Sequence, residues 1–169
     1  MKVLQFFKKH FKYDYWILTL FIILLDQLTK VIIFQYLFKS MKTIQVFFFF
    51  NLTPVWNNGI SFGLFHESGQ IGRYLFIFIG ISFGILIPII SNSWNRIERI
   101  GASILAGGAI GNALDRIFYG SVVDFLDFHW HSIHFPTFNF ADTFITMGVV
   151  LIFFGSIKYN NSGDKLKND

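Results

Sequence analysis

Two aspartates in apolar surroundings are the residues of this sequence best suited to acid–base chemistry. Asp124 stands within Val122–Phe125, and Asp142 directly precedes an apolar run. Two carboxylates close together in a poorly solvated site share a proton, because both cannot ionise easily. One can then accept a proton from water while the other protonates a carbonyl or leaving group, without a metal or a covalent intermediate. Taken separately, Asp124 could be an exposed loop acid and Asp142 a helix N-terminal acid.

Further ionisable residues lie where hydrocarbon is expected. Asp26 and Lys30 are four residues apart in an apolar run, so they share one helical face with the acid N-terminal to the base. Such residues are costly inside a membrane and often mark function. A mutually neutralising structural pair is nevertheless the simpler interpretation of these two.

The segment Gly107–Arg116 combines packing and polar features. Gly107 and Gly111 form a small-x-x-x-small pattern, which lets a second helix approach closely. Asn112 and Arg116 lie four residues apart on one face of the same helix. At about 1.5 Å per residue, this helix brings Arg116 to the outer membrane boundary.

Five other side chains compete for a chemical role. Asp115 is expected to cap or pair locally near its helix end, and Asp127 is expected in a hairpin. Together with Asp127, the residues His129, His131 and His134 raise the alternative of a zinc site on the outer surface. Their spacing matches no strong zinc motif, so a solvated hairpin is the favoured interpretation, and we predict no metal.

The composition is that of a membrane protein. Of 169 residues, 53% are hydrophobic and only 14% are charged, whereas soluble domains carry about 25% charged residues. Disorder is excluded, because it needs low hydrophobicity and high charge. The absence of cysteine excludes a disulfide scaffold. There is no Gly-rich phosphate loop and no serine nucleophile elbow. The pI near 9.4 is explained by cytoplasmic lysines and requires no nucleic acid.

Four segments are expected to cross the membrane, since a span needs about 20 mostly apolar residues. They are about 15–37, 72–94, 100–117 and 141–158, with 38–71 and 118–140 outside the membrane and a mobile tail over 159–169. The stretch 43–65 also lacks charge, but Pro54 and Gly59 would break a helix there. Residues 44–50 are therefore expected to form a strand or an interfacial segment.

The basic residues predict the orientation of these spans. Nine lie on the side of the termini and four on the other, which fits the positive-inside rule with cytoplasmic termini. The first apolar run is followed by Asp26–Lys30 instead of the small residues of a cleavage site. We therefore expect a retained first helix.

Five motifs, in this order, resemble those of the bacterial lipoprotein signal peptidases (signal peptidase II). They are DQLTK at Asp26–Lys30, NNGISFG at Asn57–Gly63, GGAIGNALDR at Gly107–Arg116, VVDF at Val122–Phe125 and FNFAD at Phe138–Asp142. The second has Ile-Ser where the family commonly has two alanines. The His-rich hairpin is a second departure from the family.

The resemblance implies an aspartyl endopeptidase that removes the signal peptide from diacylglyceryl-modified prolipoproteins, cutting before the lipidated cysteine. Asp124 and Asp142 would be the catalytic dyad, and Asp26 and Lys30 would have a structural or substrate-positioning role. The residues that would line or support the site are Asn57, Gly59, Asn112, Arg116 and Asn139. The implied fold is an all-α membrane protein of four transmembrane helices with a small extracytoplasmic β-cradle and an interfacial helix, both supplied within 43–70.

The expected partners are the prolipoprotein substrate and membrane lipid, with no cofactor and no nucleic acid. We expect a monomer in the bacterial inner membrane, with its active site near the outer leaflet. Two alternatives use the same carboxylates differently. In a small proton-coupled transporter, Asp26, Asp124 and Asp142 would form a relay, although four spans are few for alternating access without a dimer or a repeat. In a membrane adaptor, the polar residues would only fix helix packing.

Overall fold

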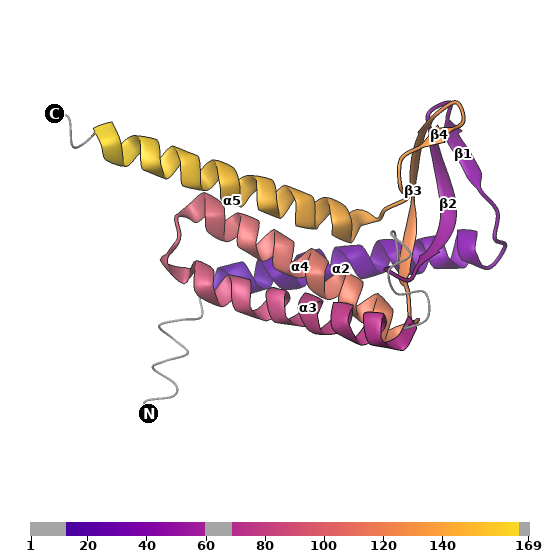
Figure 1. The fold of residues 1–169 in the computed structure, drawn as a ribbon, viewed down its shortest axis with the longest axis horizontal. Coiled ribbons are helices and arrows are strands. Elements are labelled where there is room, and N and C mark those ends of the chain that lie inside the picture. Colours follow the sequence, from indigo (N-terminus) through magenta and orange to yellow (C-terminus); the bar gives the residue numbers. More distant parts are fainter. Residues whose placement is uncertain (1–12, 60–68, 166–169) are drawn as a thin grey trace.

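The structure is a computed structural model that describes residues 13–59 and 69–165 (Figure 1). The helices of the described residues run roughly along one direction, and a sheet lies across one end of them. The helices are α2 (Tyr13–Ile33), α3 (Gly69–Ile90), α4 (Arg96–Phe118) and α5 (Phe140–Lys165). A π-helical turn, η1 (Phe34–Phe38), prolongs α2, and a 3-10 turn, η2 (Ser91–Ser93), follows α3.

The sheet has four antiparallel strands in the order β1-β2-β3-β4. They are β1 (Ile44–Phe47), β2 (Phe50–Asn57), β3 (Val122–Trp130) and β4 (Ile133–His134). The strand expected within 44–50 is therefore confirmed, as is the hairpin around Asp127. The predicted interfacial helix would include residues 60–68, which lie outside the described residues. Helix α5 continues beyond the predicted end of the fourth span at 158.

Helix α4 lies at the centre of the bundle and packs against α2, α3 and α5. Small residues make this possible. A Cβ at Gly107 would lie 2.6 Å from Cβ of Ile22 in α2, and a Cβ at Gly80 of α3 would lie 2.9 Å from the Ala109 carbonyl oxygen. The close approach predicted from the glycine pattern is confirmed, and it encloses the polar face of α4 between other helices.

Among the described residues, three helices are long and apolar enough to cross a membrane: Tyr13–Phe38, Gln70–Ser93 and Phe140–Tyr159. Helix α4 is not one of them. Its sequence is rich in glycine, alanine and polar residues, because its surroundings are other helices and it needs no apolar exterior. The central helix α4 therefore differs from its three neighbours in being less apolar.

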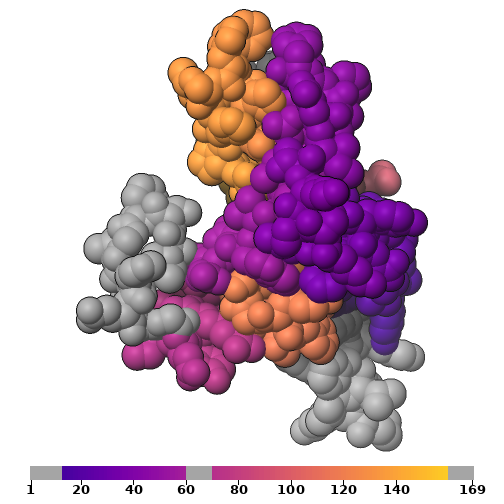
Figure 2. All heavy atoms as spheres, turned by 90° about the vertical axis from the view of Figure 1, so that its right-hand side faces the viewer, coloured from indigo at the N-terminus to yellow at the C-terminus, as the bar shows by residue number. Residues whose placement is uncertain are grey.

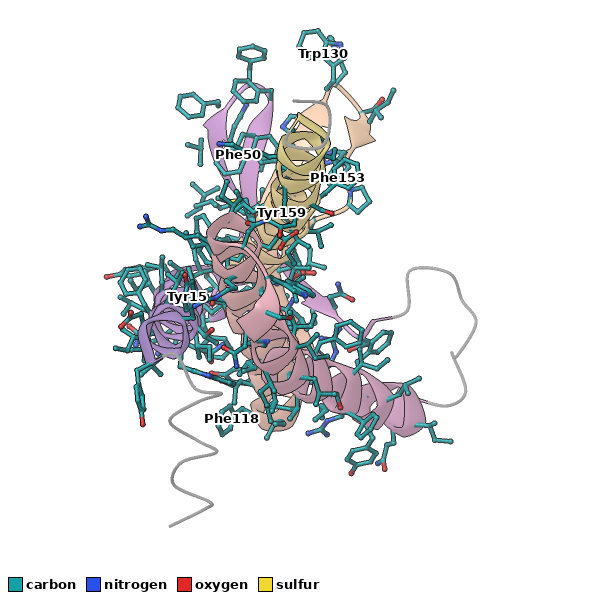
Figure 3. All side chains as sticks on the ribbon, turned by 90° about the vertical axis from the view of Figure 1, so that its left-hand side faces the viewer. Tyr15, Phe50, Phe118, Trp130, Phe153 and Tyr159 are labelled. Carbon is teal, nitrogen blue, oxygen red and sulfur yellow. The ribbon has the colours of Figure 1, made fainter. Side chains whose placement is uncertain are left out.

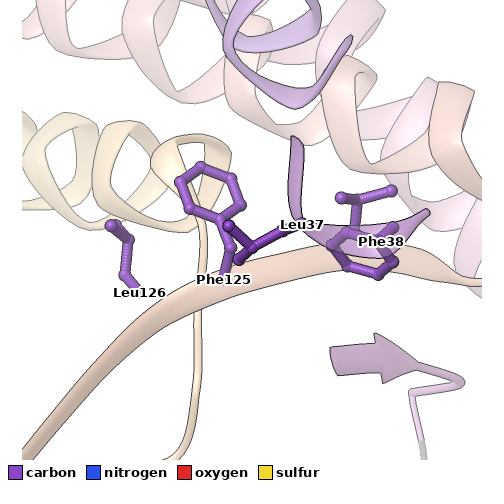
Figure 4. Packing of buried hydrophobic residues seen from close by; sticks show 5 residues of the cluster. Leu37, Phe38, Phe125 and Leu126 are labelled. Atoms are coloured by element: carbon purple, nitrogen blue, oxygen red, sulfur yellow. The ribbon is translucent and has the colours of Figure 1, made fainter. Parts of the chain in front are cut away.

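A small apolar core joins the sheet to the end of α2 (Figure 4). It consists of Leu37 and Phe38 from η1 together with Val123, Phe125 and Leu126 from β3. Strand β3 is held in register by β2, with Val55 opposite Asp124 and Asn57 opposite Val122. This core and this register fix the beginning of β3, and therefore Asp124, at the end of the helix bundle.

Candidate active site

Asp124 is buried near the beginning of β3, where it accepts two amide hydrogen bonds. Its Oδ2 accepts from Nδ2 of Asn57 at 2.8 Å, and its Oδ1 accepts from Nδ2 of Asn139 at 2.6 Å. Asn57 ends the neighbouring strand β2, whereas Asn139 directly precedes α5. The sheet and the last helix thus meet at this carboxylate, which is 1% exposed.

Asp142 lies in the first turn of α5 and takes part in a reciprocal cap. Its Oδ2 accepts from the backbone N–H of Asn139, and Oδ1 of Asn139 accepts from the backbone N–H of Asp142, both at 3.1 Å. This arrangement satisfies two backbone donors at the helix start. The other oxygen, Oδ1, accepts from Nδ2 of Asn112 in α4 at 2.8 Å. Asp142 is therefore more than a helix N-terminal acid, since a second helix also binds it.

Asn139 connects the two carboxylates. Its fully buried side-chain amide donates to Asp124 while its backbone N–H donates to Asp142. The same Nδ2 also donates to Oδ1 of Asn112 at 3.1 Å. Asp124 and Asp142, which are far apart along the chain, therefore both bind Asn139. The elements around them are β2, β3, α4 and α5.

The electrostatics of this site favour the protonated form of Asp124 more than water does. Burial, together with the neighbouring charge of Asp142, raises the pKa of Asp124 from 3.8 to about 6. The hydrogen bonds from Asn57 and Asn139 oppose this rise, as does the positive charge of Lys30. The two carboxylates are therefore close enough for their charges to interact. One of them can act as a proton donor while the other accepts.

Beside this site, Lys30 is the centre of a buried ionic network between α2 and α4. Its Nζ lies 2.9 Å from Oδ2 of Asp26 and 2.8 Å from Oδ2 of Asp115. It also donates to Oδ1 of Asn112 at 3.0 Å. The predicted pair of Asp26 and Lys30 is confirmed, and Asn112 links it to Asp142.

Two residues of this network had no such role in the sequence analysis. Asp115 does more than pair locally: besides accepting from the Val123 N–H at 3.1 Å, it binds Lys30 of another helix. Gln27 donates to Oδ1 of Asp115 at 3.0 Å and to the Gly111 carbonyl at 3.2 Å. Both residues lie inside the quoted motifs, but only the packing of α2 on α4 shows what they contact.

Gly59 and Arg116 lie on the side of the site toward α3. The Gly59 N–H donates to Oδ1 of Asn57 at 2.7 Å. The Nδ2 group on the other side of this side-chain amide is then directed to Asp124. Gly59 has φ of +81°, and a Cβ there would lie 2.6 Å from the ring of Phe76. The Arg116 guanidinium stacks on the same ring at 4.9 Å from its centroid. It donates to the Asn112 carbonyl at 3.2 Å.

Asp127 belongs to a different cluster, farther along β3. It lies 2.7 Å from Nδ1 of His134 and accepts from Oγ1 of Thr53 at 2.9 Å. Burial raises the pKa of this carboxyl, but hydrogen bonds from His134, Thr53 and Asn51 outweigh burial and lower it overall. Within the described residues, no three His, Asp or Glu side chains are placed to hold a metal ion.

Two hydrogen-bonded carboxylates, the buried Asp124 and the half-buried Asp142, lie beside helices of membrane-spanning length. This combination is typical of one class of protein, the membrane-embedded aspartic hydrolases. The comparison with known families is consistent with this class. The family model described as signal peptidase (SPase) II matches residues 18–158. The chain therefore belongs to the signal peptidase II family, a family of aspartic peptidases.

Relatives and solved structures agree with this assignment. A lipoprotein signal peptidase of Shewanella amazonensis is 38% identical over 160 residues, which are 89% of this chain and 90% of that protein. One of Burkholderia thailandensis is 37% identical over 144 residues, covering 83% and 86% of the two chains. A bacterial membrane enzyme solved by the in meso method at 2.3 Å resolution is similar with a TM-score of 0.72 and 31% identity, over 90% of this chain and 93% of that one. The family and the apolar helices indicate a protein of the bacterial inner membrane.

Proposed function

We propose that this chain is an aspartyl endopeptidase that removes signal peptides from diacylglyceryl-modified prolipoproteins, cutting before the lipidated cysteine. Family membership supports the reaction and its substrate class. The binding of Asp124 and Asp142 to the same residue, Asn139, carries the assignment of the catalytic dyad. The transporter and adaptor alternatives are not favoured, because the family match covers residues 18–158.

In this mechanism the two aspartates divide the proton chemistry. Asp124, whose pKa is raised to about 6, holds the proton and donates it to the scissile carbonyl oxygen. Asp142 accepts a proton from a water molecule, and the water oxygen attacks the carbonyl carbon to give a gem-diol. Asp142 then gives this proton to the amide nitrogen while Asp124 takes a proton back from a gem-diol hydroxyl. The C–N bond breaks, the new carboxyl group leaves on the signal peptide, and the amine stays on the lipidated cysteine. Hydrogen bonds from Asn112 and Asn139 hold the Asp142 carboxylate in position for these proton transfers.

The supporting residues fix the direction of each amide. Oδ1 of Asn112 accepts from both Lys30 and Asn139. Its Nδ2 must therefore point toward Asp142, because only the amide nitrogen can donate. Lys30 thus acts as a positioning residue for Asn112. Asp26, four residues earlier in the same helix, binds the Lys30 ammonium. Asn57 donates directly to Asp124, as Asn112 does to Asp142. The Gly59 N–H accounts for the Oδ1 atom of Asn57, so the Nδ2 atom of Asn57 points toward Asp124.

We propose that α4 is a fourth span, because the three apolar helices surround it along its length. Both termini then lie in the cytoplasm, and the sheet forms a cradle on the outer side, at the helix ends where Asp124 and Asp142 lie (Figure 1). A diacylglyceryl group holds its cysteine at this depth. The lipid supplies binding free energy remote from the scissile bond, which can be used to position that bond. The chain would act as a monomer, without a cofactor or a nucleic acid.

The proposal is tested by following signal-peptide release from a diacylglyceryl-modified prolipoprotein in vesicles. The purified wild type is expected to release the peptide, and Asp124→Asn and Asp142→Asn are each expected to abolish release. Circular dichroism and gel filtration should show that both variants fold. Wild-type protein that releases nothing, where a relative such as the Shewanella enzyme is active, would refute the function. Release by either variant would refute the dyad alone.

A further inference from the structure

The far end of the sheet carries a dense apolar surface that catalysis does not use. Two turns meet there, one between β1 and β2 and one between β3 and β4. We call this surface the aromatic tip and define it as Phe47, Phe48, Phe49, Trp130, Ile133 and Phe135. Phe48 is 71% exposed and Ile133 is 74% exposed, so these side chains are on the outside of the protein.

The two turns form one continuous surface. The His129 N–H donates to the Phe49 carbonyl at 2.9 Å. The rings of Phe48 and Trp130 meet edge to face at 6.2 Å between centroids, and those of Phe47 and Phe49 stack at 5.8 Å. The aromatic tip is therefore a built feature in which side chains from both turns contact each other.

Its position relative to the helices decides what covers it. The sheet crosses the helix ends at a large angle, so it extends along the membrane surface when the helices span (Figure 1). Seen from the sheet side, the two turns project past the helix ends (Figure 2). Seen along the helices, Trp130 lies beyond α5, on the side of the bundle away from α3 (Figure 3). The tip thus overhangs the lipid that surrounds α5.

The composition of the tip suits the boundary between headgroups and acyl chains. Residues 44–50 and 128–136 contain no Lys, Arg, Asp or Glu. They combine Phe and Ile with three His and one Trp, a residue that is favoured at membrane interfaces because its ring is apolar with one polar edge. Among the described residues of the sheet, the acid next to this segment is Asp127, which is buried and bound to His134, so its carboxylate does not face outward.

We propose that the aromatic tip inserts into the interfacial region of the outer leaflet, beside α5. Asp124 and Trp130 are six residues apart on β3, which is about 20 Å at about 3.3 Å per residue. The sheet would therefore be held at the bilayer at one end and at the dyad at the other. This attachment fixes the height of Asp124 relative to the leaflet in which a diacylglyceryl group lies. It depends on the helices spanning the membrane but not on the catalytic assignment.

Because the chain has no cysteine, a single introduced one gives a unique site for a fluorescent label. We would label Ile133→Cys and, separately, Phe48→Cys, and reconstitute each protein in vesicles of phosphatidylethanolamine and phosphatidylglycerol. Phe153→Cys, on an exposed position of α5, is the matched control for a lipid-facing site. Each probe is challenged with aqueous iodide and with lipids that carry a doxyl quencher at acyl carbon 5 or 16.

The tip probes are expected to be quenched by the carbon-5 lipid, at least twofold more than by the carbon-16 lipid, and to be protected from iodide. The proposal is overturned if iodide quenches both tip probes as it quenches the free dye while neither lipid does. That result would leave the tip in water, as a surface for a protein partner. An α5 probe that no lipid quenches would refute the membrane placement itself, independently of the tip.

Discussion

Replacing Lys30 by methionine is expected to destabilise the helix bundle strongly. The Lys30 ammonium lies within 3.0 Å of Asp26, Asp115 and Asn112, and both acids are fully buried. Methionine keeps the apolar stem but removes the charge, which leaves two carboxylates uncompensated between α2 and α4. Loss of one partner from a buried ion pair costs about 3–5 kcal/mol. Since folded domains are stable by about 5–15 kcal/mol, much of the stability is expected to be lost.

The assay is thermal unfolding in detergent, followed by circular dichroism. Asp115→Asn should have a smaller effect than Lys30→Met, because Asp26 still neutralises the ammonium. Thr19→Val is the matched control: Thr19 is buried in the same interface and donates to the Ser103 carbonyl at 3.1 Å. Loss of that neutral hydrogen bond should cost only about 0.5–1.5 kcal/mol.

A second comparison separates charge from packing. Combining Lys30→Met with Asp26→Asn and Asp115→Asn removes every charge of the network while keeping similar shapes. This triple variant should melt above Lys30→Met alone, because no buried carboxylate remains unpaired. The ionic explanation is refuted if Lys30→Met and Thr19→Val have the same melting temperature. It is also refuted if the triple variant has a lower melting temperature than Lys30→Met.

The remaining predictions concern the dyad and two close backbone approaches. Because the pKa of Asp124 is raised to about 6 and its protonated form is the active one, kcat/KM should fall as pH rises through about 6, and a profile flat from pH 5 to 8 would contradict this. Gly59→Ala should lower turnover roughly tenfold or more, since left-handed backbone costs a non-glycine residue about 1–3 kcal/mol, and unchanged turnover would show that the turn is dispensable. Gly107→Leu should lower the melting temperature, because even a Cβ there would lie 2.6 Å from Ile22. Gly72→Ala should not lower it, because the space around Gly72 is open. Equal melting temperatures for the two variants would contradict the tight packing.

Local spacing was sufficient to predict part of the site. The four-residue separation of Asp26 and Lys30 predicts their contact, which the structure shows at 2.9 Å. Likewise, the small-residue pattern around Gly107 predicts a close helix neighbour. Both features depend only on helical periodicity, which can be read from any apolar run.

Contacts between elements could not be predicted in the same way. The hydrogen bond from Asn57 to Asp124 depends on the register of β2 against β3, which includes an irregularity between Leu52 and Val55. Similarly, the contact of Asp115 with Lys30 depends on which face of α4 packs against α2. Neither register nor helix rotation follows from one sequence, so motif membership indicated that these residues matter without showing what they bind.

The hydropathy of α4 does not by itself show the place of this helix in the bundle. The expected span at 100–117 is a helix, but its glycines and polar residues keep it outside the group of strongly apolar helices. The physical reason is its central place, because a helix enclosed by three others contacts few lipids. Its polar face can therefore carry Asn112 to the dyad and Asp115 to Lys30.

The central claim is that Asp124 is catalytic because of its place beside Asp142, and one comparison tests it most directly. Asp127 is also a buried aspartate of β3, but it binds His134 and Thr53 instead of Asn139. The measurement is the single-turnover rate of prolipoprotein cleavage by folded Asp124→Asn and Asp127→Asn protein. We predict no detectable cleavage by Asp124→Asn and a rate within about tenfold of wild type for Asp127→Asn. Equal rates for the two variants would contradict the account.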